Sequence, residues 1–255
     1  MDLSQSRILV TNDDGIHAPG LKVLEKIARS LSNDVWVVAP ETEQSAAGHS
    51  LTLTLPLRVR KISARRFAIN GTPTDSVLLA VNHILKDHKP DLVLSGINAG
   101  GNLGEDITYS GTVAAAMEAT LLGIKAIALS QVRRNGKAVR WAPGADHAAA
   151  IVRQLIATGW LRNVVMNVNF PDVAASPVAG IAVTRQGRRK IGGRLNQGID
   201  PRGNPYIWIG TDRDQDPSIQ GTDLEAVHAG KISITPLGLD LTHAHTVAAL
   251  KTVFS

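Results

Sequence analysis

The chain has 255 residues, of which 44% are hydrophobic and 19% charged, a composition typical of a globular protein rather than a disordered or fibrous one. It contains no cysteine, which excludes disulfide bonds, thiolate catalysis and cysteine-ligated zinc, and fits a reducing compartment. The start of the chain carries no secretory signal pattern and no apolar run is long enough to span a bilayer, so we expect a cytoplasmic protein that does not enter a membrane. The net charge of +5 permits an anionic partner without requiring one.

Apolar, β-branched runs alternate with helical patterns over roughly the first 170 residues. This alternation predicts a mostly parallel sheet with helices on both of its faces. One segment, residues 51–69, alternates apolar and polar residues instead, which predicts antiparallel strands inserted in the parallel pattern. The expected strands cover residues 7–11, 35–39, 92–94, 126–129 and 164–169, and the expected helices cover 21–32, a stretch from 74 to before Pro90, 110–122 and 148–158.

The pattern changes after Pro171. Residues 185–202 hold six basic residues and one acid, which leaves the rest of the chain balanced at 21 of each sign, so the whole excess charge lies in this segment. We expect an exposed loop or arm there, packed against or reaching over a neighbouring subunit. Strands are expected at 206–209 and 231–235, and a short helix from Thr246. We divide the chain into a catalytic core, residues 1–175, and a C-terminal extension for oligomerisation, residues 176–255, packed on the same core.

Polar side chains follow several of the predicted parallel strands. The adjacent carboxylates Asp13 and Asp14 come directly after the first strand, Ser45 follows the second, and Asn98 follows the strand that begins near residue 92. Ligands of parallel sheets bind outside the carboxyl ends of the strands. An all-oxygen donor set suits Mg²⁺, Mn²⁺ or Ca²⁺ rather than zinc or copper, and a dication relieves the repulsion between neighbouring carboxylates. The alternative is an ordinary Asn-Asp-Asp-Gly turn.

A second group of residues lies at a predicted helix start, where Ser110, Gly111 and Thr112 follow a glycine-rich segment. Free backbone N–H groups and the helix dipole make such a terminus an anion site, unless Ser110 is simply the cap of the helix. The sequence lacks the glycine motifs of triphosphate P-loops and of dinucleotide sites. A cation site beside an anion pocket predicts phosphate chemistry.

Other candidate residues are weaker. His243 and His245 have the spacing of metal ligands but follow no strand of the first half, and are expected to be exposed. His49 follows Ser45 closely and is a candidate for the mouth of the site, while Trp36 is expected in the core.

Several long motifs resemble the SurE family of metal-dependent 5′/3′-nucleotidases. They are ILVTNDDGIHAPG, PETEQSAAGHSLTL, NGTPTDSV, LSGINAGGN and YSGTVAAAME, followed by DPRGNPYIWIG and GTDLEAVHAGKISITPLGLDLT. The resemblance covers nearly the whole chain. It implies a Rossmann-like fold with a β-rich C-terminal arm exchanged between subunits, giving homodimers or homotetramers.

The resemblance also implies site residues. One divalent cation per subunit, Mg²⁺ or Mn²⁺, would be held by Asp13, Asp14, Ser45 and Asn98, and the substrate phosphate by Asn12, Asn102, Ser110, Gly111 and Thr112. Asp13, Asp14 and Asn98 are the expected catalytic residues. The implied reaction releases phosphate from nucleoside 5′-monophosphates, extends to 3′-monophosphates and short polyphosphate in the family, and leaves open whether water or a carboxylate attacks phosphorus.

Three alternatives remain at this point. A haloacid-dehalogenase-type phosphatase also places Asp after its first strand, but needs a second Asp two residues later, where this chain has Gly15. A phosphorylatable receiver domain has paired acids after its first strand, but about half this length. A nucleic-acid-binding module is suggested by residues 185–202, which however interleave no aromatic platform, so no stable nucleic-acid partner is expected.

Overall fold

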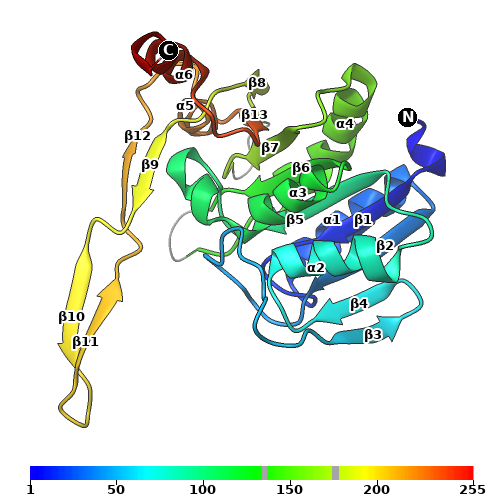
Figure 1. The fold of residues 1–255 in the computed structure, drawn as a ribbon, viewed down its shortest axis with the longest axis horizontal. Helices are drawn as coiled ribbons and strands as arrows, with labels where there is room; N and C mark the ends of the chain where they lie inside the picture. The colour runs from blue at the N-terminus through cyan, green and yellow to red at the C-terminus, as the bar shows by residue number, and fades with distance from the viewer. Residues whose placement is uncertain (134–136, 174–177, 255) are drawn as a thin grey trace.

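The computed structural model describes residues 1–133, 137–173 and 178–254. Within these residues the main sheet has nine strands, and its neighbours pair in parallel except at β3–β4 and β7–β13. The expected mostly parallel α/β fold is confirmed (Figure 1). Across the sheet the strands are β3 (Val59–Ser63), β4 (Arg66–Ile69), β2 (Asp34–Pro40), β1 (Arg7–Thr11), β5 (Leu92–Asn98), β6 (Lys125–Gln131), β7 (Val164–Phe170), β13 (Ile232–Gly238) and β8 (Ile181–Val183).

Helices cover both faces of this sheet. On one face α1 (Pro19–Leu31) and α4 (Ala142–Thr158) pack on one core cluster, and on the other α2 (Pro73–Leu79) and α3 (Gly111–Leu121) pack on a second. Successive residues of β1 supply the two clusters in turn, Ile8 and Val10 to the first and Leu9 to the second. Because both faces are buried, the strands are continuous apolar runs, which is why they could be recognised in the sequence. The shorter helical segments are η1 (Leu3–Gln5), η2 (Ala80–Ile84), η3 (Gly104–Tyr109) and α5 (Asp223–His228).

Some element boundaries differ from the expectation. The strand expected at 92–94 continues as β5 to Asn98, so Asn98 ends a strand instead of lying in a loop. The helix expected from Ala148 begins six residues earlier, at Ala142. Its first turn contains Pro143, which is common at this position, and Gly144, which has a low helix propensity. They are buried here because Gly144 packs closely against the side chains of the neighbouring strands.

The alternating segment forms strands only in its second half. β3 and β4 pair antiparallel as expected, but residues 51–58 contain no strand. Leu51, Leu53 and Leu55 of this first half are exposed, whereas Leu57 is partly buried against the second core cluster. The alternation of apolar and polar residues predicted a strand over residues 51–58, but this segment pairs with no strand of the sheet.

Trp36 is only partly buried, not a core residue as expected. Its ring stacks on Phe67 with centroids 6.1 Å apart, and the guanidinium carbons of Arg7 and Arg65 lie 5.5 and 5.8 Å from the ring centre. The indole N–H donates to Asp34 Oδ1 over 2.8 Å at the start of β2. An indole needs such a polar partner, which holds this end of the ring near the surface.

The C-terminal part contributes to the sheet and also leaves it. β13 and β8 extend the main sheet, whereas the basic segment forms a long arm that projects from the body (Figure 1). The expected exposed arm is therefore confirmed, but it is built of strands and is not a loop. Its two antiparallel pairs are β9 (Arg188–Ile191) with β12 (Arg213–Asp216), and β10 (Leu195–Ile199) with β11 (Pro205–Ile209).

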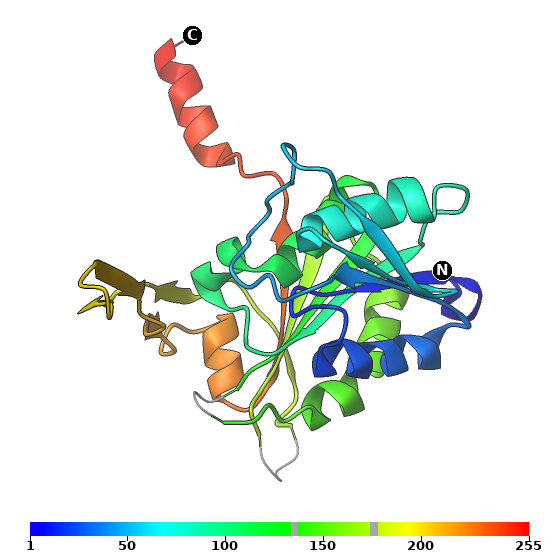
Figure 2. The same ribbon diagram turned by 90° about the horizontal axis from the view of Figure 1, so that it is seen from below.

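The chain ends in α6 (Ala244–Phe254), which confirms the expected terminal helix and points away from the body (Figure 2). No helix among the described residues is long and apolar enough to cross a membrane. The boundary that we predicted between residues 175 and 176 lies outside the described residues, and the division into core and extension stays a prediction.

Candidate functional site

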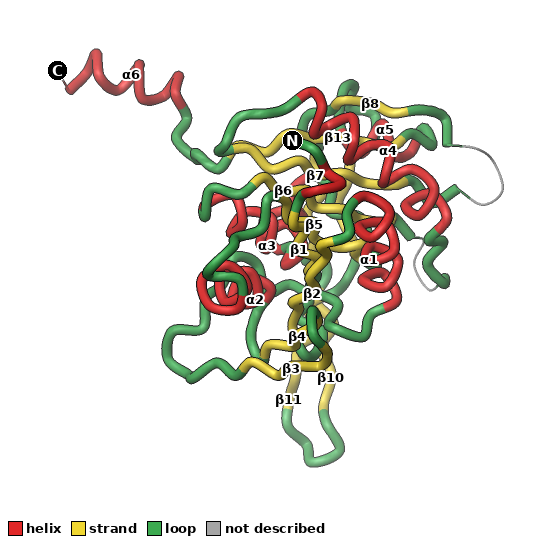
Figure 3. The backbone as a smooth tube through the Cα atoms, turned by 90° about the vertical axis from the view of Figure 1, so that its right-hand side faces the viewer, coloured by secondary structure: helices red, strands yellow, loops and turns green. Residues whose placement is uncertain are grey.

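The ends of three adjacent strands bring the predicted site residues to one edge of the sheet. β1 lies between β2 and β5, and the tube view in Figure 3 shows the same neighbours. The loop after β2 contacts the loop after β1 through the Gln44 N–H, which donates to the Asp13 carbonyl oxygen over 2.8 Å. On the other side, the Ala99 N–H after β5 donates to Asp14 Oδ2 over 3.1 Å. Two segments far apart in sequence thus hold the two adjacent acids.

Asp13 is buried against the start of α3. The Thr112 hydroxyl donates to Asp13 Oδ1 over 2.5 Å, and the Thr112 backbone N–H also bonds this carboxyl group. A Cβ on Gly111 would lie 2.8 Å from the Asp13 Cβ, so only glycine lets the helix approach this closely. The positive end of α3 is therefore directed at the Asp13 carboxylate itself.

Both acids are withdrawn from water. Burial raises the pKa of Asp13, and the Thr112 hydrogen bonds only partly oppose this. Burial, together with the negative charge of Asp13, raises the pKa of Asp14 to about 6. Two adjacent carboxyl groups in this state are stabilised as anions when a positive charge is brought between them.

Ser45 lies in the loop after β2, and Asn98 is the last residue of β5. Ser45 is exposed, and its hydroxyl donates to Glu43 Oε1 over 2.7 Å. The Asn98 amide donates from Nδ2 to the Gly100 carbonyl oxygen over 2.8 Å, so Oδ1 is the side-chain atom able to accept a cation. The two residues flank the acids from opposite sides, as their predicted role requires, and that role stays a prediction.

The oxygen donors present fit a hard divalent cation. Asn12 is fully buried and its Nδ2 donates to the Gly15 carbonyl oxygen over 3.0 Å, yet its Oδ1 accepts no hydrogen bond from any described residue. Groups of three or more His, Cys, Asp or Glu side chains suited to a metal are absent from the described residues. A cation at Asp13 and Asp14 would therefore depend on hydroxyl, amide or water oxygens for its other ligands.

Asn102 is the centre of a buried polar network that sequence reasoning did not find. Its Nδ2 donates to Ser130 Oγ over 2.8 Å, and its backbone N–H donates to Asn169 Oδ1 over 2.8 Å. Its carbonyl oxygen accepts from the side-chain amides of Asn167 and Asn169. Two asparagines inside a buried strand were the signal available in the sequence, because such polar groups need partners.

The remaining predicted residues are placed as follows. Ser110 caps α3, and its hydroxyl accepts a hydrogen bond from the Val113 N–H over 3.0 Å. Ser110 is buried, as are Gly111 and Thr112 in the first turn of the helix. His49 lies 3.0 Å from Glu118 Oε2 on α3, measured from Nε2. His243 and His245 are exposed at the start of α6 and contribute nothing to this edge of the sheet.

The chain is similar to known proteins in both sequence and structure. Residues 8–193 match the family described as Survival protein SurE. The chain is 65% identical over 253 residues to a 5′-nucleotidase SurE of Paramagnetospirillum magneticum, covering 99% of this chain and 97% of that protein. It is 60% identical to a 5′-nucleotidase SurE of Parvibaculum lavamentivorans, covering 96% and 89%. The crystal structure of a SurE protein from Aquifex aeolicus superposes with a TM-score of 0.84 at 42% identity, covering 98% of this chain and 100% of that one. The chain therefore belongs to the SurE family.

Proposed function

We propose that this chain is a metal-dependent 5′-nucleotidase, which hydrolyses nucleoside 5′-monophosphates to a nucleoside and phosphate. The observation that carries the proposal is the pair Asp13 and Asp14 at the carboxyl edge of the sheet, where Asp13 is buried against the first turn of α3 and Asp14 is partly buried. The names of the close relatives support the same activity, since they are 5′-nucleotidases over nearly the full length of both chains.

In the proposed site, Asp13, Asp14, Ser45 and Asn98 hold one dication per subunit, Mg²⁺ or Mn²⁺. When bound, a dication of this kind polarises phosphoryl oxygens and acidifies a water molecule. Thr112 orients Asp13 through its hydroxyl, so that the carboxylate keeps one position while charge develops on the substrate.

The phosphate is held by the chain's own donors beside the acids. The first N–H groups of a helix have no backbone partner within the helix. In α3 the Thr112 N–H bonds Asp13 and the Val113 N–H bonds the Ser110 hydroxyl, so the Gly111 N–H is the backbone donor that we assign to the phosphate. The Ser110 hydroxyl and the amides of Asn12 and Asn102 complete the proposed set. Asn102 is well suited to this role because Ser130 and the strand asparagines hold it rigidly.

We further propose that the substrate range includes 3′-monophosphates and short polyphosphate, and that the enzyme works as a homodimer or homotetramer. The exposed apolar side chains of the distal arm support assembly, because an isolated chain gains nothing from leaving them in water. They are Leu195, Ile199, Tyr206, Ile207, Trp208 and Ile209.

A phosphate-release assay tests the activity. Purified protein is stripped of metal and offered each nucleoside monophosphate, with and without Mn²⁺ or Mg²⁺. We expect release that depends on the dication and falls at least a hundredfold in Asp14→Asn. Full activity of Asp14→Asn in limiting Mn²⁺ would overturn the assignment.

The same preparation separates the two phosphorylation chemistries considered above. Both the haloacid-dehalogenase-type and the receiver-type mechanisms form a phosphoaspartate. We expect no stable labelling with acetyl phosphate, and trapping of such an intermediate would favour one of those mechanisms instead.

A further inference from the structure

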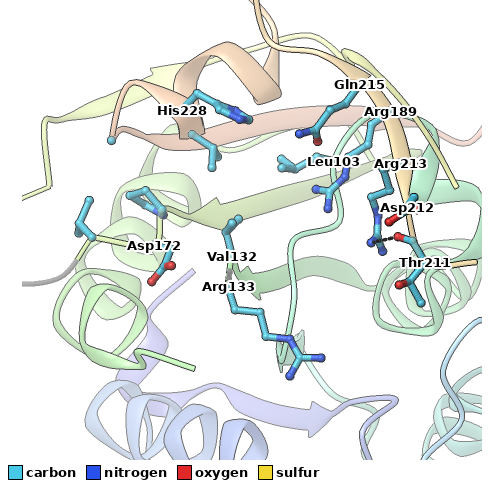
Figure 4. Close-up of a pocket in the computed structure, with 14 residues that line it drawn as sticks. Leu103, Val132, Arg133, Asp172, Arg189, Thr211, Asp212, Arg213, Gln215 and His228 are labelled. Carbon is cyan, nitrogen blue, oxygen red and sulfur yellow. Dashed lines mark hydrogen bonds between the residues drawn. The ribbon is translucent and has the colours of Figure 1, made fainter. Parts of the chain in front are cut away.

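A pocket of about 740 Å³ lies beside the Asn102 network, on the side of the arm (Figure 4). Its walls come from Leu103 just before η3, the segment after β6, the segment after β7, the base of the arm, and the end of α5. This volume is within the range of small-molecule sites in proteins.

The pocket adjoins the proposed phosphate site. Leu103 lines it and directly follows Asn102. Val132, also in its lining, lies so close to Gly101 that a Cβ there would be 2.7 Å from it. Arg133, the second residue after β6, lines the same part of the pocket as Val132.

The arm side of the pocket is held by a buried ionic cluster. Asp106 Oδ2 lies 3.2 Å from Arg189 Nε and 2.7 Å from Arg213 Nε, and all three side chains are largely buried. Asp106 belongs to η3, the segment that leads to Ser110, so the arm base and the phosphate-binding segment are joined here. Because one carboxylate lies between the two guanidinium groups, this wall offers planar donors with little excess charge.

The remaining lining is mixed in the way that suits an uncharged aromatic ligand. Leu103, Val132 and Val227 supply apolar surface. Nδ1 of His228 lies 2.9 Å from the Leu224 carbonyl oxygen, which can only accept, so Nδ1 carries the hydrogen and Nε2 is an acceptor in the neutral ring. Figure 4 shows this ring extending from α5 toward the side of the pocket where Leu103 lies.

We propose that this pocket binds the nucleoside part of the substrate, the base and the ribose, while the phosphate lies at Asp13, Asp14 and the start of α3. The inference rests on the proposed function and deepens it. Bases are recognised by apolar contact, by stacking on guanidinium planes and by hydrogen bonds to their edges. All three kinds of group are present in this lining. Its charged side chains are three arginines and two aspartates, so a nucleoside fits the pocket better than a second phosphate does.

The test compares a substrate that has a nucleoside with one that does not. The hydrolysis of AMP and of p-nitrophenyl phosphate is measured for the wild type, His228→Ala and Val227→Phe. The control variant is His83→Ala, because His83 is exposed on η2 and does not line the pocket. His228→Ala removes one hydrogen bond to the nucleoside and Val227→Phe fills the pocket, so each variant should raise the KM for AMP about tenfold. The kcat/KM for p-nitrophenyl phosphate should stay within about twofold of the wild type, and His83→Ala should leave both substrates unchanged.

Binding of adenosine to the metal-free protein, measured by calorimetry, gives a readout that does not depend on turnover. We expect binding to the wild type and to His83→Ala, weakened about tenfold in both pocket variants. Equal effects of the pocket variants on both substrates, or adenosine binding that they leave unchanged, would overturn the inference. If the wild type binds adenosine in this way but hydrolyses no nucleotide with any dication, the proposed function fails and the pocket assignment stands.

Discussion

The hydrogen bond between Thr112 and Asp13 yields the sharpest prediction. Thr112 is fully buried, and its hydroxyl donates over 2.5 Å to a carboxyl oxygen that is itself buried. Thr112→Val keeps the shape of the side chain and removes only the donor. A hydrogen bond to a charged group contributes about 1.5–3 kcal/mol, and the acceptor left behind has no water to replace it. We expect the free energy of unfolding at neutral pH to fall by this amount.

The loss of the Thr112 hydroxyl should also weaken metal binding. Because the hydrogen bond from the Thr112 hydroxyl lowers the pKa of Asp13 against the dominant effect of burial, its removal favours the protonated acid, which binds cations poorly. The dissociation constant for Mn²⁺ is expected to rise, by no more than the roughly 10- to 150-fold that 1.5–3 kcal/mol allows.

Urea denaturation measures the first effect and calorimetric titration with Mn²⁺ the second. Thr112→Ser is the matched control, since it retains the hydroxyl and loses one methyl group, a change of about 1 kcal/mol in stability. It should bind Mn²⁺ as the wild type does. A Thr112→Val protein with the stability and Mn²⁺ affinity of the wild type would refute the reasoning.

Three further outcomes are expected. Gly111→Ala should displace the Asp13 side chain and lower the unfolding free energy by about 1–3 kcal/mol. The control Gly193→Ala, whose Cβ would meet nothing within 4 Å, should leave the unfolding free energy unchanged. Equal urea midpoints of the two variants would contradict this expectation. Partial burial alone would raise the pKa of Asp34, but hydrogen bonds from neighbouring arginine and tryptophan side chains hold this pKa below 3.8. The Asp34 carboxylate therefore stabilises the fold above pH 3.8, and this stabilisation is lost as the pH falls through the lower pKa of the folded state. Asp34→Asn should therefore be less stable than the wild type at neutral pH, with a difference that shrinks in acid; a constant difference would count against it. Replacing residues 195–209 by a short Gly-Ser turn should reduce the oligomer mass in light scattering, and an unchanged mass would refute the role of the arm in assembly.

The local pattern was sufficient where burial is complete on both faces. β1, β2 and β6 are largely apolar runs, and β7 is apolar apart from Asn167 and Asn169. Each was predicted within two residues of its ends. It was insufficient where an element depends on a distant partner. In the first turn of α4, Gly144 packs against side chains of strands that come from elsewhere in the chain. Residues 51–58 form no strand, and Thr52 is held instead by hydrogen bonds to the Asp75 carboxylate in α2.

The candidate site divides in the same way. The sequence by itself determined the class of fold and the positions of Asp13, Asp14, Ser45 and Asn98 at strand ends, because strand order along the chain and the polar residues after each strand are local properties. Only the tertiary structure decided what surrounds those residues: the start of α3 directed at Asp13, the asparagines of β7 around Asn102, and the ionic cluster that ties the arm to η3. Each of these is a contact between segments some 65 to 107 residues apart. No periodicity along a chain encodes such contacts, since they arise only when the sheet brings the carboxyl ends of its strands together.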